Sequence, residues 1–217
     1  MKLVLGNKIK NIEGQEFLDL IKEFDKKIVD LGTGDGKYVL RNGLKNPNRL
    51  YIGIDPIKKQ MQASSRKVAR KKLPNVLFIV ASAENLPWEL NEIVDEVKII
   101  FPWGSLLNYV ANCDLEKIQK IRNLLKKDGT LEIVFGYTKD KEPVETGRLG
   151  LEILSEDYLK DFLVPKYKQA GFSLLKMEKL EKKEFPDIGS SWSKRLDFGS
   201  KRPVFRLVLG SSSFEKS

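Results

Sequence analysis

A glycine-rich loop with an acidic residue in front of it is the first feature of this chain that could do chemistry. The loop reads DLGTGDG over residues 30–36 and follows the segment KKIV, which ends in two β-branched residues. Glycines at such a turn let the backbone approach a ligand closely, and a helix that follows offers free N–H groups. The third glycine of the dinucleotide fingerprint GxGxxG would fall at position 37, which is Lys37. The loop therefore fits an acid followed by GxGxG, although a tight connection without any ligand is the alternative.

The acidic residue Asp30 distinguishes between cofactors by its charge. A carboxylate beside the ligand would repel a pyrophosphate, whereas it would attract the sulfonium and ammonium groups of S-adenosylmethionine. The sequence thus favours S-adenosylmethionine over NAD. We expect Asp30, Gly32, Thr33 and Gly34 to contribute to its pocket.

Two more acidic positions follow predicted strands. Asp55 closes the run YIGID about 20 residues beyond the glycines, a spacing at which an acid can accept hydrogen bonds from ribose hydroxyls. A helix N-cap ahead of Pro56 is the alternative role for Asp55. Ala83 and Glu84 follow the run NVLFIVAS, where a nucleotide base could rest against the loop backbone. For Glu84, the alternative is a solvated loop acid.

Aromatic residues stand where a substrate base would be needed. The segment FPWG, residues 101–104, follows the run EVKII, and Trp192 lies in a polar, glycine-flanked segment. Enzymes that modify a base flip it out of its stack and hold it against aromatic side chains. Trp103 and Trp192 could clamp one base between them, whereas a rim position on the core is the alternative for Trp103.

Basic residues are concentrated in two segments. Residues 58–72 contain seven bases and no acid, and residues 194–206 contain five bases and one acid. Lys67, Arg70 and Lys71 would share one face of a helix. Contact with phosphates is the natural use of such a face, and a solvated helix surface is the alternative.

The composition excludes several classes of function. The chain has 217 residues, a net charge of +9 and a pI near 9.4, so we expect one domain with a polyanionic partner. The absence of histidine excludes Ser-His-Asp and Cys-His catalysis, and with one cysteine it excludes a Cys/His zinc cage. No apolar run approaches the length of a membrane span. We therefore expect a cytoplasmic monomer without a metal or a membrane anchor.

The elements that position these residues alternate between apolar runs and helix-like stretches. This alternation predicts an α/β fold with a largely parallel sheet covered on both faces. The last two runs have no long helix between them, which indicates a C-terminal antiparallel hairpin. Seven strands ending in this way fit the Rossmann-like methyltransferase arrangement over residues 1–217. We expect an N-terminal hairpin within residues 1–13 and inserted substrate loops at 138–150 and 185–202.

The motifs DLGTGDG, YIGIDP, ASAENLP, FPWGSLL and SWSKRLDFGSKR occur in this order and spacing. Together they resemble the 16S ribosomal RNA (adenine-1408 N1) methyltransferases, a family that confers aminoglycoside resistance. The resemblance covers essentially the whole chain, and the FPWG and WSKRLDFG segments are its most specific parts. It implies a Rossmann-like enzyme that uses S-adenosylmethionine and acts on the assembled small ribosomal subunit.

The resemblance also implies roles for individual residues. Pro102 would lie near the target base, Trp103 and Trp192 would stack on it, and Ser190 would face the pocket. The cofactor pocket would comprise Asp30, Gly32, Thr33, Gly34, Asp55, Pro56, Ala83 and Glu84. The RNA-docking surface would comprise Lys67, Arg70, Lys71, Lys194, Arg195, Lys201 and Arg202. The segment from Lys139 to Arg148 has no clear counterpart in the family, so Glu145 and Arg148 receive no role.

Two other functions remain open from the sequence. A tRNA base methyltransferase would share the cofactor loops and the basic surface. A catalytically silent RNA-binding protein would share the fold, although the intact Asp30 loop, Asp55 and both tryptophans argue against it. An NAD-dependent dehydrogenase is disfavoured by the missing third glycine.

Overall fold

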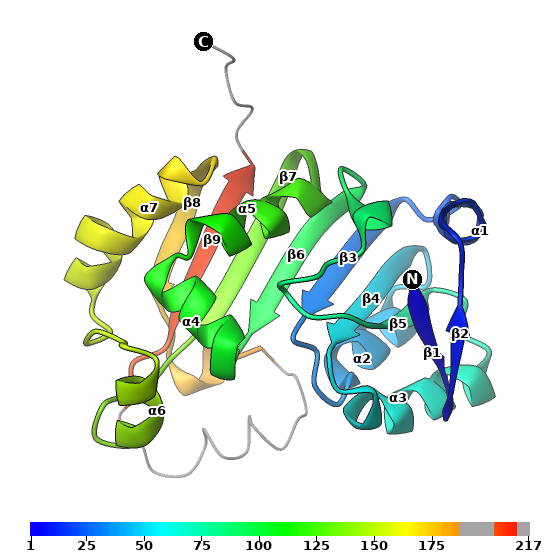
Figure 1. Ribbon diagram of the computed structural model, residues 1–217, viewed down its shortest axis with the longest axis horizontal. Coiled ribbons are helices and arrows are strands. Elements are labelled where there is room, and N and C mark those ends of the chain that lie inside the picture. The colour runs from blue at the N-terminus through cyan, green and yellow to red at the C-terminus, as the bar shows by residue number, and fades with distance from the viewer. Residues whose placement is uncertain (187–201, 212–217) are drawn as a thin grey trace.

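The computed structural model describes residues 1–186 and 202–211, which form a mixed sheet with helices on both faces (Figure 1). Within these residues the sheet has nine strands in the order β2-β1-β5-β4-β3-β6-β7-β9-β8. The strands are β1 (Lys2–Leu5), β2 (Lys8–Asn11), β3 (Lys26–Leu31), β4 (Arg49–Asp55), β5 (Val76–Val80), β6 (Val94–Ile100), β7 (Leu125–Phe135), β8 (Phe172–Lys179) and β9 (Phe205–Ser211).

The predicted α/β class with a C-terminal antiparallel hairpin is confirmed. Strands β5, β4, β3, β6 and β7 are parallel neighbours, and β9 pairs antiparallel with both β7 and β8. The predicted number of seven strands is too low. The sheet gains two strands because β1 pairs antiparallel with β5 at Leu3 and Ile79, which attaches the pair β1–β2 to the sheet edge.

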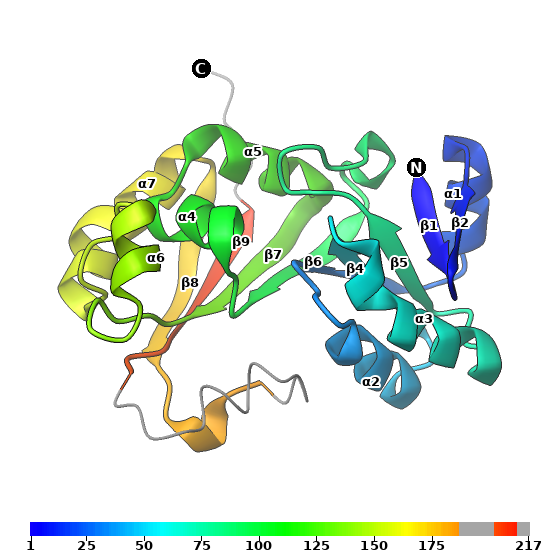
Figure 2. The ribbon, with the colours of Figure 1, turned by 60° about the horizontal axis from the view of Figure 1, so that its bottom comes forward.

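The helices form one layer on each side of the sheet. Figure 2 shows α2 and α3 on one side and α4, α5, α6 and α7 on the other. The α-helices are α1 (Gly14–Ile21), α2 (Lys37–Lys45), α3 (Lys58–Lys71), α4 (Gly104–Asn112), α5 (Leu115–Leu124), α6 (Pro143–Arg148) and α7 (Val164–Gln169). The described residues also contain two 3-10 helices, η1 (Trp88–Leu90) and η3 (Lys182–Glu184), and one π-helix, η2 (Tyr158–Leu163). None of the helices in residues 1–186 and 202–211 is long and apolar enough to cross a membrane.

The strand sequences explain the two layers. Every residue of β4 after Arg49 is buried, as expected for a central strand that is covered on both faces. Helix α3 buries only Met61, Ser64 and Ser65, so most of its basic residues face solvent. Met61 joins Val39 and Phe78 in the core cluster under α2 and α3. A larger cluster fills the opposite side of the sheet.

The N-terminal hairpin is attached to α3 as well as to the sheet. Its turn contains Gly6, whose φ is +62°, a left-handed conformation that glycine adopts readily. The Gly6 N–H donates to the Ser65 hydroxyl over 2.8 Å, and that hydroxyl donates to the Val4 carbonyl over 2.7 Å. Arg66 adds a hydrogen bond to the Asn7 side chain at 3.1 Å. Residues 2–11 are therefore fixed against the start of the basic surface.

Candidate active site

A cavity of about 550 Å³ opens at the carboxyl ends of four parallel strands, β3, β4, β5 and β6. Strand β3 has β4 on one side and β6 on the other, so the chain order reverses direction at this strand. Open α/β sheets bind their ligands outside such a switch point. The loops after these four strands supply the lining residues, and each loop contains one of the motifs singled out in the sequence.

The glycine loop after β3 forms one wall of the cavity. The N–H groups of Gly32 and Thr33 both donate to the Ile54 carbonyl, at 2.9 and 3.0 Å, and tie the loop to the end of β4. Gly32 has a φ of +77°, and a Cβ there would lie 2.7 Å from Leu106 Cδ2. A side chain at position 32 would therefore crowd the cavity wall, which explains on steric grounds why the position is a glycine.

Asp30 is a buried carboxyl group at the base of the cavity. Burial raises its pKa to about 7, against a hydrogen bond from the Thr33 hydroxyl and the charge of Lys98, both of which lower it. The Thr33 hydroxyl donates to Asp30 Oδ2 over 2.6 Å. Asp30 can therefore gain or lose its proton near neutral pH, and a cation in the cavity would favour the ionised form.

Asp55 connects the end of β4 to the glycine loop. Its Oδ2 accepts a hydrogen bond from the Gly34 N–H at 3.0 Å, and its Oδ1 accepts one from the Ile57 N–H at 2.8 Å. Burial raises the pKa of Asp55, and these two N–H groups counteract the rise. Helix α3 begins at Lys58, so Asp55 closes a turn ahead of the helix instead of capping it. A carboxylate has about four acceptor positions, which leaves capacity for ligand hydroxyls.

The loop after β5 places Ala83 and Glu84 at the cavity wall. Ala83 is buried, and Glu84 Oε1 accepts a 2.5 Å hydrogen bond from the Tyr109 hydroxyl on α4. Hydrogen bonds from Ser82 and Tyr109 lower the pKa of Glu84 to about 2. Glu84 is therefore a fixed, ionised side chain, and the alternative of a freely solvated acid does not describe it.

The aromatic segment after β6 forms the opposite wall. Phe101 adopts a φ of +50°, which is uncommon for a residue with a Cβ, and its ring meets Phe185 edge-on at 5.7 Å. Pro102 is buried, whereas Trp103 precedes the first residue of α4 and is 42% exposed while lining the cavity. The strained turn thus places one accessible indole beside the cavity.

The structure brings most of the predicted site residues together and leaves others undescribed. All eight predicted cofactor residues line this single cavity, together with Pro102 and Trp103. The predicted positions Ser190, Trp192, Lys194, Arg195 and Lys201 lie outside the described residues. Lys67, Arg70 and Lys71 are exposed on α3. The roles of all these residues stay predictions.

Arg202 has a different setting from the basic residues of α3. Its Nη2 forms an ion pair with Glu142 Oε1, and only 13% of the Arg202 side chain is exposed. Glu142 also accepts a hydrogen bond from the Thr138 N–H at 3.0 Å. The pair therefore joins the segment 138–150, which contains the short helix α6, to the residues that precede β9. The unassigned Glu145 and Arg148 pair with each other at 2.8 Å.

Sequence reasoning missed part of the cavity lining. The missed residues are Leu31, Asp35, Tyr38, Ile54, Ile57, Gln60, Ala81, Ser82, Ile100, Phe101, Ser105 and Leu106. A signal was available for two of them, because Tyr38 and Gln60 lie in the first turns of the helices that follow predicted ligand loops. Within residues 1–186 and 202–211, no cluster of three or more potential metal ligands occurs.

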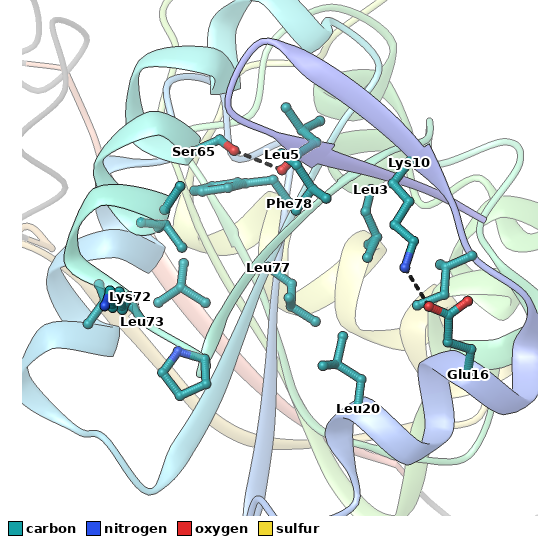
Figure 3. Close-up of a pocket in the computed structure, with 16 residues that line it drawn as sticks. Leu3, Leu5, Lys10, Glu16, Leu20, Ser65, Lys72, Leu73, Leu77 and Phe78 are labelled. Atoms are coloured by element: carbon teal, nitrogen blue, oxygen red, sulfur yellow. Dashed lines mark hydrogen bonds and ion pairs between the residues drawn. The ribbon is translucent and has the colours of Figure 1, made fainter.

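A second cavity of about 590 Å³ lies under the N-terminal hairpin, between α1 and α3 (Figure 3). Its lining is largely aliphatic and includes Leu3, Leu20 and Leu77, with the Lys10–Glu16 ion pair of 2.5 Å at its edge. It lies beside the outer edge of β5, away from the carboxyl ends of the strands, and it contains none of the motif residues. The polar cavity is therefore the candidate active site.

Comparisons with known proteins agree with this geometry. A family model described as NpmA, 16S rRNA (adenine(1408)-N(1))-methyltransferase, matches residues 2–210. A 16S rRNA (adenine(1408)-N(1))-methyltransferase of Escherichia coli is 36% identical over 215 residues, which cover 95% of this chain and 97% of the relative.

Solved structures give the same result. A 30S ribosomal A1408 methyltransferase from an uncultured bacterium is 39% identical, with a TM-score of 0.79 and coverage of 97% of this chain and 100% of the other. An aminoglycoside resistance methyltransferase is 34% identical, with a TM-score of 0.82 and coverage of 97% and 98%. The resemblance drawn from the motifs is thus confirmed, and the chain belongs to the family of 16S rRNA (adenine(1408)-N(1))-methyltransferases.

Proposed function

We propose that this chain transfers a methyl group from S-adenosylmethionine to N1 of adenine 1408 in the 16S rRNA of the assembled 30S subunit, and thereby confers aminoglycoside resistance. The proposal rests on family membership and on the activities for which the relatives are named. The single structural observation that carries it is one cavity that combines two buried carboxyl groups, Asp30 and Asp55, with an accessible indole, Trp103.

The residues of the cavity fit S-adenosylmethionine. Asp30 lies at the base of the cavity, where an ionised carboxylate would attract the ammonium and sulfonium groups. Asp55 lies one strand away with acceptor capacity for the ribose hydroxyls, and the buried Ala83 offers an apolar surface for the base. The glycine loop between them allows close backbone approach. Side chains at Gly32 and Gly36 would also clash, with Leu106 and Phe78 respectively. When bound, the cofactor supplies an electrophilic methyl group.

The reaction requires no general base from the protein. Adenine N1 carries a free lone pair at neutral pH, so the N1–methyl bond can form as the methyl–sulfur bond breaks. This chemistry suits a chain without histidine. The contribution of the protein is orientation of the flipped base, with Trp103 stacking on its ring. The Pro102 carbonyl and the Asp30 carboxylate would accept hydrogen bonds from the N6 amino group as positive charge develops on the adenine.

The basic face of α3 is the proposed contact with rRNA. Lys67, Arg70 and Lys71 are exposed on it, and α3 contains no acidic residue. Charge alone selects a polyanion and not a particular RNA, so the choice of the 30S subunit comes from the family. We propose that the protein acts there as a monomer in the cytoplasm.

The direct test is to incubate the protein with purified 30S subunits and labelled S-adenosylmethionine, and to map reverse-transcription stops on the 16S rRNA. A stop at adenine 1408 is expected, because a methyl group on N1 blocks base pairing. Purified tRNA serves as the competing substrate. Label in tRNA without label in 30S subunits would overturn the proposed substrate while leaving the cofactor assignment intact.

A further inference from the structure

A row of paired charges crosses the sheet and ends beside the candidate active site. In the register of the sheet, Lys98 on β6 lies opposite Asp30 on β3 and opposite Glu132 on β7. The Lys98 ammonium forms ion pairs with Glu132 Oε2 and, at 3.4 Å, with Glu96 Oε2. Residues directly opposite each other on neighbouring strands point to the same face of a sheet. Asp30, Lys98 and Glu132 therefore lie side by side on three neighbouring strands, on the same face of the sheet.

The row continues away from the cavity and keeps its acids paired. Arg206 on β9 lies 3.1 Å from Glu132 and 2.8 Å from Glu178 on β8. On the other side, Lys26 pairs with Glu96 at 3.2 Å. Glu132 and Glu96 each have a second cationic partner, so Lys98 is not their sole counter-charge.

The Lys98 ammonium is largely withdrawn from solvent, with 17% of its side chain exposed. Burial lowers the pKa of Lys98, but the Glu132 and Glu96 carboxylates outweigh this effect and the pKa rises overall. Lys98 therefore stays protonated through the neutral range. A fixed, poorly screened charge on the strand next to Asp30 acts on that carboxyl group more strongly than a solvated surface lysine would.

The other groups around Asp30 come from several elements. Asp35 in the glycine loop and Asp55 on β4 both raise the pKa of Asp30 through their negative charges. The Thr33 hydroxyl donates a hydrogen bond to it, and Tyr38 on α2 stays neutral because burial raises its pKa. Lys98 is the cation that counters the two acids.

We propose that Lys98 is a positioning residue that favours the ionised form of Asp30 for a cationic cofactor, and that Glu132 limits this effect because its ion pair holds the Lys98 ammonium toward β7. The register places Lys98 opposite Asp30 in the cofactor pocket. The ion pairs of Glu132 with Lys98 and with Arg206 extend this connection to the outer part of the sheet. This inference rests on the proposed function, because it assigns a determinant of S-adenosylmethionine binding.

The proposal predicts a specific pH dependence. The pKa of Asp30 lies at about 7, so the cofactor binds more tightly as the pH rises through 7 and the carboxyl group ionises. Replacing Lys98 by glutamine would raise this pKa by about one unit. Cofactor affinity should then fall roughly five- to tenfold at pH 6.5, because ionisation of Asp30 then costs more, and change less than about twofold at pH 8.

Replacing Glu132 by glutamine should change the cofactor affinity in the opposite direction. Without the Glu132 carboxylate, the Lys98 charge is less neutralised and acts more fully on Asp30, so affinity at pH 6.5 should rise. Lys98→Arg keeps the charge and should keep the normal profile. In Lys98→Gln, Arg206 and Lys26 still pair with the two glutamates, which favours a folded protein.

The experiment is calorimetric titration of the full chain and these three variants with S-adenosylmethionine at pH 6.5 and pH 8. Opposite shifts for Lys98→Gln and Glu132→Gln at pH 6.5, which shrink to less than about twofold at pH 8, are the expected result. A merely structural role for the row would weaken binding in both variants at both pH values, and that result, or no change at either pH, would overturn the inference.

A second readout separates this inference from the proposed function. The Asp30 carboxyl carbon can be titrated by NMR in the protein without ligand, with Asp30→Asn to assign its signal. A higher Asp30 pKa in Lys98→Gln and a lower one in Glu132→Gln would support the inference even if the cofactor did not bind. Absence of S-adenosylmethionine binding by the unsubstituted chain at pH 8 would instead count against the proposed function.

Discussion

At the scale of single residues, Trp103 shows how backbone strain can serve a site. The preceding residues, Phe101 and Pro102, turn sharply after β6, with Phe101 at a positive φ and Pro102 buried. Trp103 is consequently held at the cavity while a large part of its indole stays accessible. A tryptophan that served only to complete the core would be expected to bury its ring more fully.

Trp103→Ala should reduce methylation of 30S subunits by about ten- to a hundredfold, because stacking of a base on an aromatic ring contributes about 1–3 kcal/mol. The affinity for S-adenosylmethionine should change little. Single-turnover methylation and calorimetry measure the two quantities separately. Trp192→Ala should behave in the same way if the sequence-based pairing of the two tryptophans is correct.

Trp88 offers a matched control for Trp103. It is 71% exposed on η1 and does not line the cavity, so Trp88→Ala removes an equally large surface ring without touching the proposed base site. This variant should retain methylation. A loss of cofactor affinity in Trp103→Ala as large as the loss of methylation would contradict the stacking role.

At the scale of elements, Gly36 joins the glycine loop to the layer beneath it. Its φ is +68°, and a Cβ there would lie 2.4 Å from Phe78 Cε1 on β5. Gly104 has a similar φ of +61° but has nothing within 4 Å of a Cβ. The two glycines therefore separate the cost of backbone conformation from the cost of a steric clash.

Gly104→Ala should lower the free energy of unfolding by about 1–2 kcal/mol, the cost of a left-handed conformation for a residue with a Cβ. Gly36→Ala should lower it by a further 1–3 kcal/mol or so, because Phe78 must move within a packed core. Chemical denaturation of both variants measures the difference. Equal losses would show that the core accommodates the extra methyl group at position 36.

The ion pair between Glu142 and Arg202 links two segments that the sequence suggested as separate substrate loops. Both side chains are nearly buried, so removing one partner leaves a charge without compensation. Arg202→Met and Glu142→Gln should each lower stability by about 3 kcal/mol, and the double variant should lose less than the sum. A double-mutant cycle from thermal unfolding measures this coupling.

The same variants test the RNA role predicted for Arg202. If its main contact is Glu142, then Arg202→Met should leave the salt dependence of 30S binding unchanged. A slope reduced by about 0.7–0.9 would instead count one lost phosphate contact.

The sequence predicted the features that depend on local pattern. Strand β3 and the glycine loop were predictable because an apolar run ends directly in closely spaced glycines, and the following motifs lie at other strand ends. The attachment of β1 to β5 was not predictable, because one bridge between Leu3 and Ile79 joins residues far apart in sequence. Lys98 was missed for a related reason, since a lysine within an apolar strand acquires its meaning only from Asp30 and Glu132 on neighbouring strands.

At the scale of the whole molecule, the charge is distributed unevenly between the two helical layers. Helix α2 has three basic residues and α3 has six, and neither contains an acid. The opposite layer mixes both signs in local pairs, such as Glu116 with Lys120 on α5 and Glu156 with Lys160. The net charge of +9 is thus expressed mainly on the side of α2 and α3, which is the side expected to face a polyanion.

This asymmetry predicts that the position of the basic residues affects 30S binding more than the total charge of the protein does. A variant with Lys67, Arg70 and Lys71 all changed to glutamate should bind 30S subunits more weakly. A control variant with Lys127, Lys160 and Lys168 changed to glutamate has the same change in net charge. Those three lysines are exposed, on β7, η2 and α7. The control should bind nearly as well as the unsubstituted chain if contacts with phosphates, and not overall attraction, determine affinity.

The salt dependence of 30S binding distinguishes direct contacts with phosphates from overall attraction by the net charge. Each phosphate contact contributes about 0.7–0.9 to the slope of log affinity against log salt concentration, because it releases a condensed counterion. Loss of all three contacts on α3 should therefore reduce the slope by about 2–3, whereas the control should shift it by less than about 1. Cofactor binding should be the same in both variants, because neither set of residues lines the cavity. Equal slopes for the two variants would mean that the α3 face attracts the subunit only through net charge, and the docking surface would then have to lie elsewhere on the molecule.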